Sequence, residues 1–449
     1  MSEARRVIIL GAAGRDFHDF NLMYRDDPMH RVVAFTAAQI PDIAGRRYPP
    51  ELAGPLYPEG IPIFDEAELP RLIREFDVDV CLFAYSDMPY ARVMGLSAIA
   101  NAAGADFLLA SPKHTQLKSR KPVIAVVATR TGAGKSPACR HIVELLAARN
   151  LKVVTVRHPM PYGDLAAQAV QRFATLEDLQ RHRCTIEERE EYEPHIARGG
   201  VVYAGVDYAA ILEATENDPA GCDVILWDGG NNDFPFYRAD LTLTIADPHR
   251  AGDELNYYPG EVNLRMADVV IVNKVDSAPR DKVEEVLRNI AAVNPGARVI
   301  EARSRVSADD PAVIAGKRVL VIEDGPTLTH GGMSIGAGSI AAHVCGAAEI
   351  IDPRPYAVGT LKDTLAKYPH LERALPAMGY GEAQLRDLAA TVAACPCDAA
   401  VIGTPVDLAR LINLGHPSTR VRYELEEAGP EVLPQVLDDF LDAVSSRRA

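Results

Sequence analysis

The sequence has no long apolar run. Its longest apolar stretches have the length of a strand and fall far short of the ~20 residues that a membrane-spanning helix needs. The N-terminus, MSEARRVIIL, passes straight into an expected strand and lacks the apolar core and cleavage site of a signal peptide. We therefore expect a protein that makes no contact with a membrane.

The sequence also lacks an excess of positive charge and an even set of cysteines. It has 47 Lys and Arg against 62 Asp and Glu, and the formal net charge of −15 disfavours general affinity for nucleic acid. Any anionic ligand must then be held by a local basic pocket. Seven cysteines without framework spacing suit a reducing compartment, so we expect a cytoplasmic protein.

What is present is the composition of an ordinary globular protein. Apolar residues make up 48% of the 449 residues and charged residues 24%, and the length exceeds that of one ordinary domain. Apolar runs alternate with helix-like segments along the first part of the chain. Strands are expected at 6–10, 31–37, 78–86 and 105–111, and helices at 68–76 and near 90–103. This alternation predicts a parallel sheet covered by helices on both faces.

A polar, basic stretch at 113–122 reads as a linker, and a second α/β series follows it. Its apolar runs begin with PVIAVVA and continue at 152–156, 201–206, 223–228, 241–247, 267–276 and 297–302. Later in the chain we expect a helix near 382–394 and strands at 398–405 and 419–425. The predicted fold class is α/β, with three parts. Residues 1–118 form a Rossmann-like domain, 119–305 a phosphate-loop nucleotide-binding domain, and 306–449 a C-terminal α/β extension or separate domain.

Residues 129–136, TRTGAGKS, lie between an apolar strand and an expected helix, which is the context of a phosphate-binding loop. The loop departs from the usual pattern because Thr129 stands where a first glycine is normal. The expected nucleotide contacts are Thr131, Gly132, Ala133, Gly134, Lys135 and Ser136. In such loops the lysine bridges the β- and γ-phosphates and the hydroxyl ligates Mg²⁺, so we expect ATP and Mg²⁺ as cofactors.

Two downstream elements fit the same assignment. Asp228 ends the strand VILWD, where phosphate-loop enzymes place the carboxylate that holds Mg²⁺, so Ser136 and Asp228 are the predicted metal-site residues. Asn273, Lys274 and Asp276 have the N-K-x-D form that recognises guanine in GTPases. Related ATP-using families keep similar residues there, and the choice between ATP and GTP stays open.

Taken together, the motifs resemble one known family over the whole chain. They are RVIILGAAGRDFHDFN, ATRTGAGKS, LWDGGNNDFPF, ADPHRAGDE, VNKVDSAP and EDGPTLTHGGM, and they resemble the cyclic 2,3-diphosphoglycerate synthetases. The resemblance implies an ATP-dependent ligase that closes 2,3-diphosphoglycerate into a cyclic phosphoanhydride and releases ADP and phosphate. Arg130 occupies the position at which phosphate-loop enzymes with a deviant loop carry a second lysine, so it is expected either to clamp the transferred phosphoryl group or to be a solvent-exposed arginine. That clamp often acts across a dimer interface, which leaves a homodimer open.

The substrate of that reaction, a small phosphorylated metabolite, carries up to five negative charges and needs basic groups. Strand ends supply two pairs, Arg157 with His158 and His249 with Arg250, at the edge where α/β proteins bind ligands. Further candidates are Arg15 and His18 after the first turn and His330 in the C-terminal glycine-rich loop. We expect an anion pocket between domains, with Lys135, Arg130, Asp228, His249 and Arg250 as the catalytic residues.

Two rival functions remain open. One is a regulatory GTPase of the same loop class, such as a metal-delivery or maturation factor, for which NKVD would read guanine. The other is an ATP-dependent ligase acting on a different anionic metabolite. Two further patterns are interpreted as structural: Cys395-Pro-Cys397 has no second cysteine pair, and the acidic run 187–191 is expected to be a solvated helical face.

Overall fold

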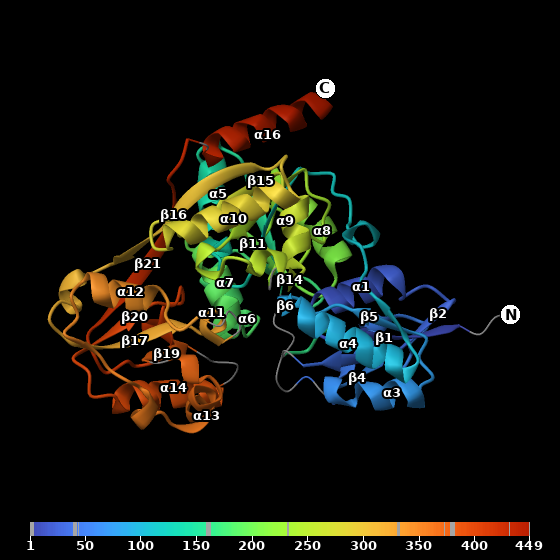
Figure 1. The fold of residues 1–449 in the computed structure, drawn as a ribbon, viewed down its shortest axis with the longest axis horizontal. Helices are drawn as coiled ribbons and strands as arrows, with labels where there is room; N and C mark the ends of the chain where they lie inside the picture. Colours follow the sequence, from blue (N-terminus) through green and yellow to red (C-terminus); the bar gives the residue numbers. More distant parts are fainter. Residues whose placement is uncertain are drawn as a thin grey trace.

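The computed structural model of the chain describes residues 4–38, 43, 45–158, 163–230, 233–329, 333–371, 373–377, 382–430 and 432–448. Two large β-sheets organise these residues. The N-terminal sheet forms one lobe, a second sheet runs through the centre, and its C-terminal continuation forms another lobe on the opposite side (Figure 1).

The N-terminal lobe contains a six-stranded sheet with the order β3-β4-β2-β1-β5-β7. Its strands are β1 (Arg5–Leu10), β2 (His30–Ala37), β3 (Arg47–Tyr48), β4 (Ile61–Asp65), β5 (Val80–Phe83) and β7 (Asp106–Leu108). Its helices are α1 (Arg15–Met23), α2 (Pro50–Ala53), α3 (Leu69–Glu75) and α4 (Tyr90–Ala103). Apart from the β3–β4 pair the strands are parallel, as a Rossmann-like lobe requires. The strand order reverses between β1 and β5, and ligands of such sheets bind at that point.

The second sheet has thirteen strands, twelve in the order β10-β11-β9-β12-β8-β13-β15-β16-β21-β20-β17-β18 and β19 beside β17. The strands of its first half are β8 (Val123–Ala128), β9 (Val153–Arg157), β10 (Gln171–Phe173), β11 (Val201–Ala204), β12 (Val224–Trp227), β13 (Leu241–Ala246) and β15 (Val269–Val272). Those of its second half are β16 (Arg298–Ala308), β17 (Arg318–Asp324), β18 (Glu349–Ile350), β19 (Ala374–Ala377), β20 (Ala399–Ile402) and β21 (Ser418–Glu427). A short ribbon of β6 (Met88–Pro89) and β14 (Tyr257–Tyr258) joins the N-terminal lobe to the central part of the molecule.

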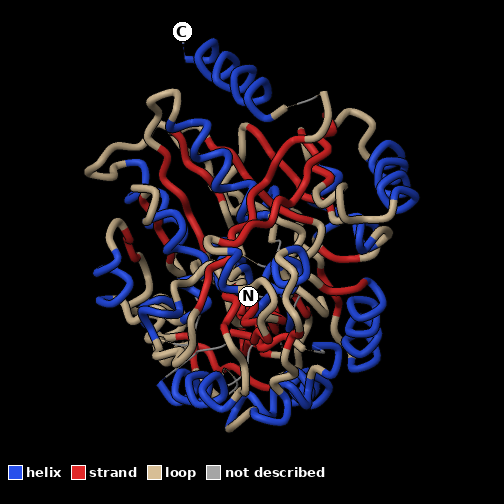
Figure 2. The backbone as a smooth tube through the Cα atoms, turned by 90° about the vertical axis from the view of Figure 1, so that its left-hand side faces the viewer, coloured by secondary structure: helices blue, strands red, loops and turns tan. Residues whose placement is uncertain are grey.

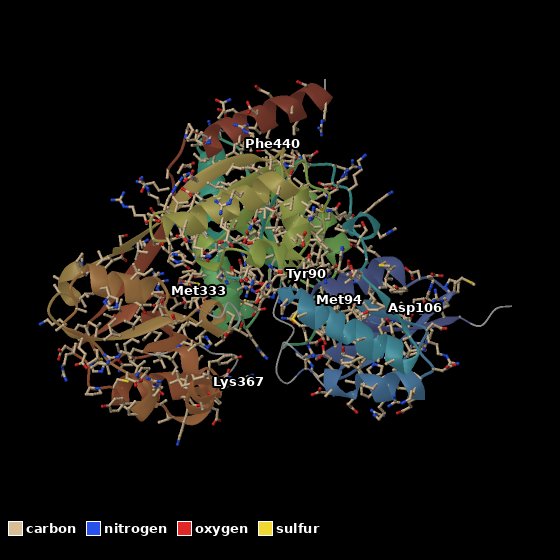
Figure 3. All side chains as sticks on the ribbon, in the orientation of Figure 1. Tyr90, Met94, Asp106, Met333, Lys367 and Phe440 are labelled. Carbon is tan, nitrogen blue, oxygen red and sulfur yellow. The ribbon has the colours of Figure 1, made fainter. Side chains whose placement is uncertain are left out.

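Helices cover both faces of this sheet, and the tube in Figure 2 shows strands lying between helical layers. They are α5 (Lys135–Ala147), α6 (Leu176–Arg181), α7 (Ile186–Ile196), α8 (Tyr208–Glu216), α9 (Gly260–Met266), α10 (Arg280–Val293), α11 (Gly325–Thr329), α12 (Ala337–Val344), α13 (Gly359–Lys367), α14 (Glu382–Ala394), α15 (Leu408–Leu411) and α16 (Leu433–Arg448). All six residues of β8 are buried, which explains why central strands read as continuous apolar runs. Phe440, labelled in Figure 3 on α16, packs into the same core as Ile142 of α5.

Strand β16 carries the central sheet into the C-terminal lobe. Residues 298–301 pair in parallel with β15, and residues 302–308 pair antiparallel with β21. Strands of 306–449 therefore continue the sheet of the phosphate-loop region. The boundaries proposed from the sequence, 1–118, 119–305 and 306–449, remain a prediction.

The carboxyl ends of the central parallel strands face the junction between the lobes. The Tyr90 hydroxyl of α4, labelled in Figure 3 at this junction, donates a hydrogen bond to Glu261 Oε2 of α9 at 2.6 Å. Because β8, β9, β12, β13 and β15 end at one edge, the loops after them converge. The candidate functional residues come from those loops.

Candidate active site

The phosphate loop leaves β8 and ends at the first turn of α5. Gly132 and Gly134 adopt positive φ values of 79° and 111°, which only glycine takes without strain. A Cβ on Gly134 would lie 2.1 Å from the Asn273 amide nitrogen, so this glycine is also required by packing. Thr129 fits where glycine is usual, because the described non-glycine residues with a positive φ do not include it. Its hydroxyl donates a hydrogen bond to Ile245 O at 3.3 Å.

The NKVD segment braces this loop from the neighbouring strand. Asn273 Nδ2 donates to Ala133 O at 3.0 Å, and Lys274 Nζ donates to Gly132 O at 2.7 Å. Lys274 also pairs with Asp247 at 2.7 Å. Asp276 is exposed and lines the cavity described below. The contacts of Asn273 and Lys274 stabilise the loop without indicating which base is bound.

Lys135 and Asp228 meet at the centre of the site. Lys135 Nζ lies 2.5 Å from Asp228 Oδ1, while Asp228 Oδ2 is paired with Arg157 and lies 3.4 Å from His195 Nε2. Burial alone would raise the pKa of Asp228, but Arg157 and Lys135 outweigh it and hold that pKa well below its usual range. Asp228 is therefore ionised and ready to face a cation.

Helix α7 supplies the acidic wall of the site. Glu191 pairs with Arg157, and its Oε2 lies 3.4 Å from the Ser136 hydroxyl. Glu187 is 1% exposed and also lines the cavity. The expectation that 187–191 is a solvated face is therefore wrong, because α7 packs across the sheet edge and turns these carboxylates inward. A charged run has the same periodicity in both situations, so the sequence alone could not separate them.

One continuous cavity of about 980 Å³ joins the three parts of the molecule. The central sheet contributes the phosphate loop and Asp247, and the N-terminal lobe contributes Arg15 and Asp16. The C-terminal lobe contributes an apolar wall that includes Met333, labelled in Figure 3, whose sulfur lies 4.0 Å from Lys274 Nζ. A phosphate loop with space on both sides suits a nucleotide together with a second substrate.

The two basic pairs predicted to act together lie on opposite sides of the phosphate loop. Arg157 ends β9 and His158 follows it, whereas His249 and Arg250 follow β13, and β12 and β8 separate those strands. Arg250 donates to Asp247 Oδ2 at 3.0 Å, beside Lys274, and His249 contacts Ser277 at 2.9 Å. The pair 249–250 therefore lies on the NKVD side. Because strand order puts the pair there, we propose that it contacts the nucleotide, in place of the predicted binding of the acceptor.

Two other candidates have surroundings that do not fit their predicted roles. Arg130 is held by Asp87 at 2.8 Å and by Asp253, stacks on Tyr257 at 3.6 Å, and is not among the described residues that line the cavity. It ties the loop to the junction between lobes and is not placed as a phosphoryl clamp. His18 is buried and stacked on Phe236 at 4.2 Å. Burial lowers its pKa to about 4, so it offers no positive charge to an anion. His330 lies outside the described residues.

Arg15 does line the cavity, and its neighbours there include acidic residues that were not among the predicted site residues. Its Nη1 lies 3.7 Å from Asp233 Oδ1, and Asp16 lines the same wall. Asp16 Oδ1 accepts the amides of Ala13 at 2.8 Å and Gly14 at 3.1 Å, so it occupies the position that a phosphate takes in dinucleotide-binding turns. Both residues lie in motifs that the sequence singles out, GRDFHDFN and DGGNNDFPF, but a pocket for a multiply charged anion predicts basic residues and not acidic ones.

The described residues contain no group of three or more His, Cys, Asp or Glu side chains that could hold a metal ion alone. Ser136, Asp228 and Glu191 instead present a hydroxyl and two carboxylates beside the phosphate loop. Such oxygen ligands fit a Mg²⁺ ion that arrives with nucleotide phosphates and takes few ligands from the protein. No helix among the described residues is long and apolar enough to cross a membrane.

Comparison with known proteins places this site in a family. The chain is 60% identical over 436 residues to the arginine synthetase ArcE of Thermococcus kodakarensis, and the match covers 97% of both chains. The chain belongs to the family of this arginine synthetase. Residues 211–301 also match the CobW/HypB/UreG nucleotide-binding domain family. The chain thus has a phosphate-loop domain and is an enzyme of the ligase class that binds a nucleotide.

More distant relatives of the arginine synthetase family carry the name expected from the sequence. The cyclic 2,3-diphosphoglycerate synthetase of Thermococcus kodakarensis is 25% identical over 211 residues, which cover 43% of this chain and 48% of that protein. The expected relationship is therefore correct at the level of synthetases with a phosphate loop. Among solved structures, LpxK from Aquifex aeolicus in complex with ATP has a TM-score of 0.43 at 10% identity, covering 73% of this chain and 90% of that one.

Proposed function

We propose that the protein forms arginine from citrulline, ammonia and ATP, with ADP and phosphate as the other products. The supporting observation is the relative named arginine synthetase, 60% identical over 97% of the chain, together with a complete phosphate loop at the wall of a two-substrate cavity. An ATP-consuming reaction also suits the cytoplasmic location that the cysteine content indicates.

The chemistry of a phosphate loop restricts how arginine can be made. Such a loop transfers a γ-phosphoryl group to an oxygen, but the guanidinium group of arginine contains no oxygen. The precursor must therefore carry an oxygen where arginine carries nitrogen, and that precursor is the ureido amino acid citrulline. Phosphorylation makes the ureido oxygen a good leaving group, which ammonia can then replace.

The two steps balance without a further reactant. The γ-phosphorus forms a bond to the ureido oxygen, its bond to the β,γ-bridging oxygen breaks, and ADP leaves. Ammonia next adds to the activated carbon, the carbon–oxygen bond breaks, and phosphate leaves with the ureido oxygen and one proton from ammonia. The remaining group is the guanidinium of arginine.

Lys135 and Arg157 are the cations placed for the first step. Both now pair with Asp228, so phosphates entering the loop would compete for them with that carboxylate. Positioning and charge neutralisation supply most of the catalysis in phosphoryl transfer. Ser136, Asp228 and Glu191 would hold Mg²⁺, which, when bound, neutralises charge on the phosphates.

His158 is placed to assist the second step. It lines the cavity between the phosphate loop and the N-terminal lobe, and its Nε2 is buried without a hydrogen-bond partner among the described residues. Burial and the nearby cations Lys135 and Arg157 hold the pKa of His158 well below its usual range, so the ring is neutral. A neutral imidazole can accept a hydrogen bond from ammonia, whereas an imidazolium would repel ammonium.

Formation of cyclic 2,3-diphosphoglycerate is the second candidate, favoured by the 25% identical relative. The acidic residues Asp16, Glu187 and Asp233 along the cavity wall weigh against a substrate with up to five negative charges. The match to the CobW/HypB/UreG domain family favours the third candidate, a regulatory GTPase.

One experiment separates the three candidates. Purified protein is incubated with Mg²⁺ and ATP or GTP, and with either citrulline plus ammonium or 2,3-diphosphoglycerate. We expect arginine and ADP in a 1:1 ratio only with ATP, citrulline and ammonium together. Phosphoanhydride signals in the phosphorus NMR spectrum would instead support the cyclic product, and metabolite-independent hydrolysis of GTP would support the GTPase.

A further inference from the structure

Two buried groups of opposite charge face the cavity at the end away from the NKVD segment. Arg15 follows β1 and Asp233 follows β12, and they are 3% and 6% exposed. Arg15 Nη1 and Asp233 Oδ1 lie 3.7 Å apart, beyond a hydrogen bond, and neither atom has a hydrogen-bond partner among the described residues. Burying two polar atoms of opposite charge without hydrogen bonds lowers the stability of the protein, unless a ligand supplies the missing hydrogen bonds.

The rest of each side chain is firmly held. Arg15 Nη2 donates to Tyr85 O at 2.7 Å, which spans the β1–β5 switch point of the N-terminal sheet. Its guanidinium carbon lies 5.1 Å from the ring centroids of both Phe234 and Tyr258. Ser86 hydrogen-bonds to Asp233. Each side chain is therefore preorganised in the cavity wall, with one polar atom left without a hydrogen-bond partner among the described residues.

The same cavity connects this pair to the phosphoryl-transfer groups. Asp233 lies five residues after Asp228 on one loop, and the His158 ring packs against Gly14, where a Cβ would come within 2.6 Å of Nδ1. The cavity wall thus runs from Arg15 and Asp233 past His158 to Lys135. A substrate held at the pair can extend a chain toward the phosphate loop.

We propose that Arg15 and Asp233 bind the α-amino-acid head group of the substrate, Arg15 Nη1 holding the α-carboxylate and Asp233 Oδ1 the α-ammonium. The inference rests on the proposed function, because citrulline and arginine share this head group and differ only at the far end. A zwitterion matches an adjacent cation and anion, whereas a phosphorylated anion would be attracted by one and repelled by the other. The site therefore selects a free amino acid.

The test combines two variants with two substrate analogues. Asp233→Asn removes the anion and Arg15→Met removes the cation with little change in shape, while 5-ureidopentanoate lacks the α-amino group and 4-ureidobutylamine lacks the carboxylate. We expect either variant to raise the KM for citrulline about 10- to 100-fold, the range for one charge-assisted hydrogen bond, with the KM for ATP unchanged. Asp233→Asn should no longer distinguish citrulline from 5-ureidopentanoate, and Arg15→Met should no longer distinguish it from 4-ureidobutylamine.

Asp19→Asn is the matched control, because Asp19 is buried on α1 near Arg15 but is not among the described residues that line the cavity. Measured at pH 8, where Asp233 is ionised in both proteins, its KM for citrulline should match the wild type. Circular dichroism and nucleotide binding establish that each variant is folded. An unchanged KM for citrulline in folded Asp233→Asn and Arg15→Met proteins would overturn the head-group site and leave arginine formation intact.

Calorimetry of citrulline binding, with ADP present, separates failure of the site from failure of the reaction. If the wild type binds citrulline without making arginine, and both variants lose binding, the head-group site stands and the proposed reaction is wrong. If the wild type neither binds citrulline nor makes arginine, both proposals fall.

Discussion

Lys135 is the residue on which phosphoryl transfer depends most directly. Its Nζ is part-buried beside Asp228, and we propose that it becomes the cation between the β- and γ-phosphates when nucleotide is bound. Lys135→Ala should lower kcat by about 100- to 1000-fold, the range for losing one preorganised charge in a transition state. Steady-state kinetics measures the loss. Circular dichroism should show native secondary structure, and a folded variant with wild-type kcat would refute the role.

Asp233 gives the site a dependence on pH. Burial is the largest of the effects that together raise the pKa of Asp233 from 3.8 to about 7. Asp16 and Asp19 also raise this pKa, whereas Arg15 lowers it. The folded protein therefore keeps this proton up to about pH 7 while the unfolded chain has lost it, so this group's contribution to the free energy of unfolding falls as pH rises toward 7. An α-ammonium pairs with the ionised form only.

Citrulline binding should consequently tighten as pH rises through 7. For a pKa of about 7, the ionised fraction of Asp233 grows about 10-fold from pH 6 to pH 8, and the association constant should follow it. Calorimetry at the two values measures this, with Asp233→Asn as the control that binds weakly at both. Equal affinity of the wild type at pH 6 and pH 8 would contradict the assignment of Asp233 as the ammonium ligand.

At the scale of secondary-structure elements, strand order determines which residues lie close enough to bind the same ligand. The sequence predicted β9 and β13 and the basic pairs that follow them, but not that β12 and β8 separate the strands. Arg250, beside Asp247 and Lys274, therefore belongs to the nucleotide side. Arg250→Ala should raise the KM for ATP about 10-fold, or about 1.4 kcal/mol, and leave the KM for citrulline unchanged. The opposite pattern would restore the role that the sequence suggested.

Helix α7 places Glu191 against Ser136 and Arg157, and this position predicts a metal effect. Glu191→Gln removes one of two carboxylates from the expected Mg²⁺ surroundings, so the Mg²⁺ concentration for half-maximal rate should rise about 10-fold at saturating ATP. Glu193→Gln on the same helix, which is not among the described cavity-lining residues, is the control and should behave as wild type. Identical Mg²⁺ titrations for the two variants would exclude Glu191 from the metal site.

The elements themselves were largely predictable, because apolar runs of strand length alternate with helical patterns and a glycine turn. The expected strand at 6–10 is β1, and the expected helix at 382–394 is α14. Contacts between distant segments were not predictable. The burial of Glu187 and Glu190 on α7, and the pairing of Arg15 with Asp233, depend on how lobes meet, which no local periodicity encodes.

At the scale of the whole molecule, each part of the structure contributes different residues to one cavity. The central sheet carries the phosphate loop, the N-terminal lobe carries Arg15, and the C-terminal lobe supplies the apolar wall near Met333. The resemblance noted in the sequence identified a synthetase with a phosphate loop. The resemblance also implied a multiply charged anion as the substrate. The phosphate loop itself does not encode the second substrate, so the loop could not test that implication. The mixed charge of the cavity wall, visible only after folding, favours a zwitterion.

In the proposed reaction the nucleotide activates the ureido oxygen of citrulline, and an oxygen label shows where this atom goes. Citrulline carrying ¹⁸O in its ureido group is incubated with ATP, Mg²⁺ and ammonium, and phosphate is examined by mass spectrometry. Because the ureido oxygen leaves bonded to phosphorus, each arginine formed should be matched by one phosphate that contains ¹⁸O. Unlabelled phosphate accompanied by unchanged, fully labelled citrulline would show that the ureido oxygen does not accept the γ-phosphoryl group.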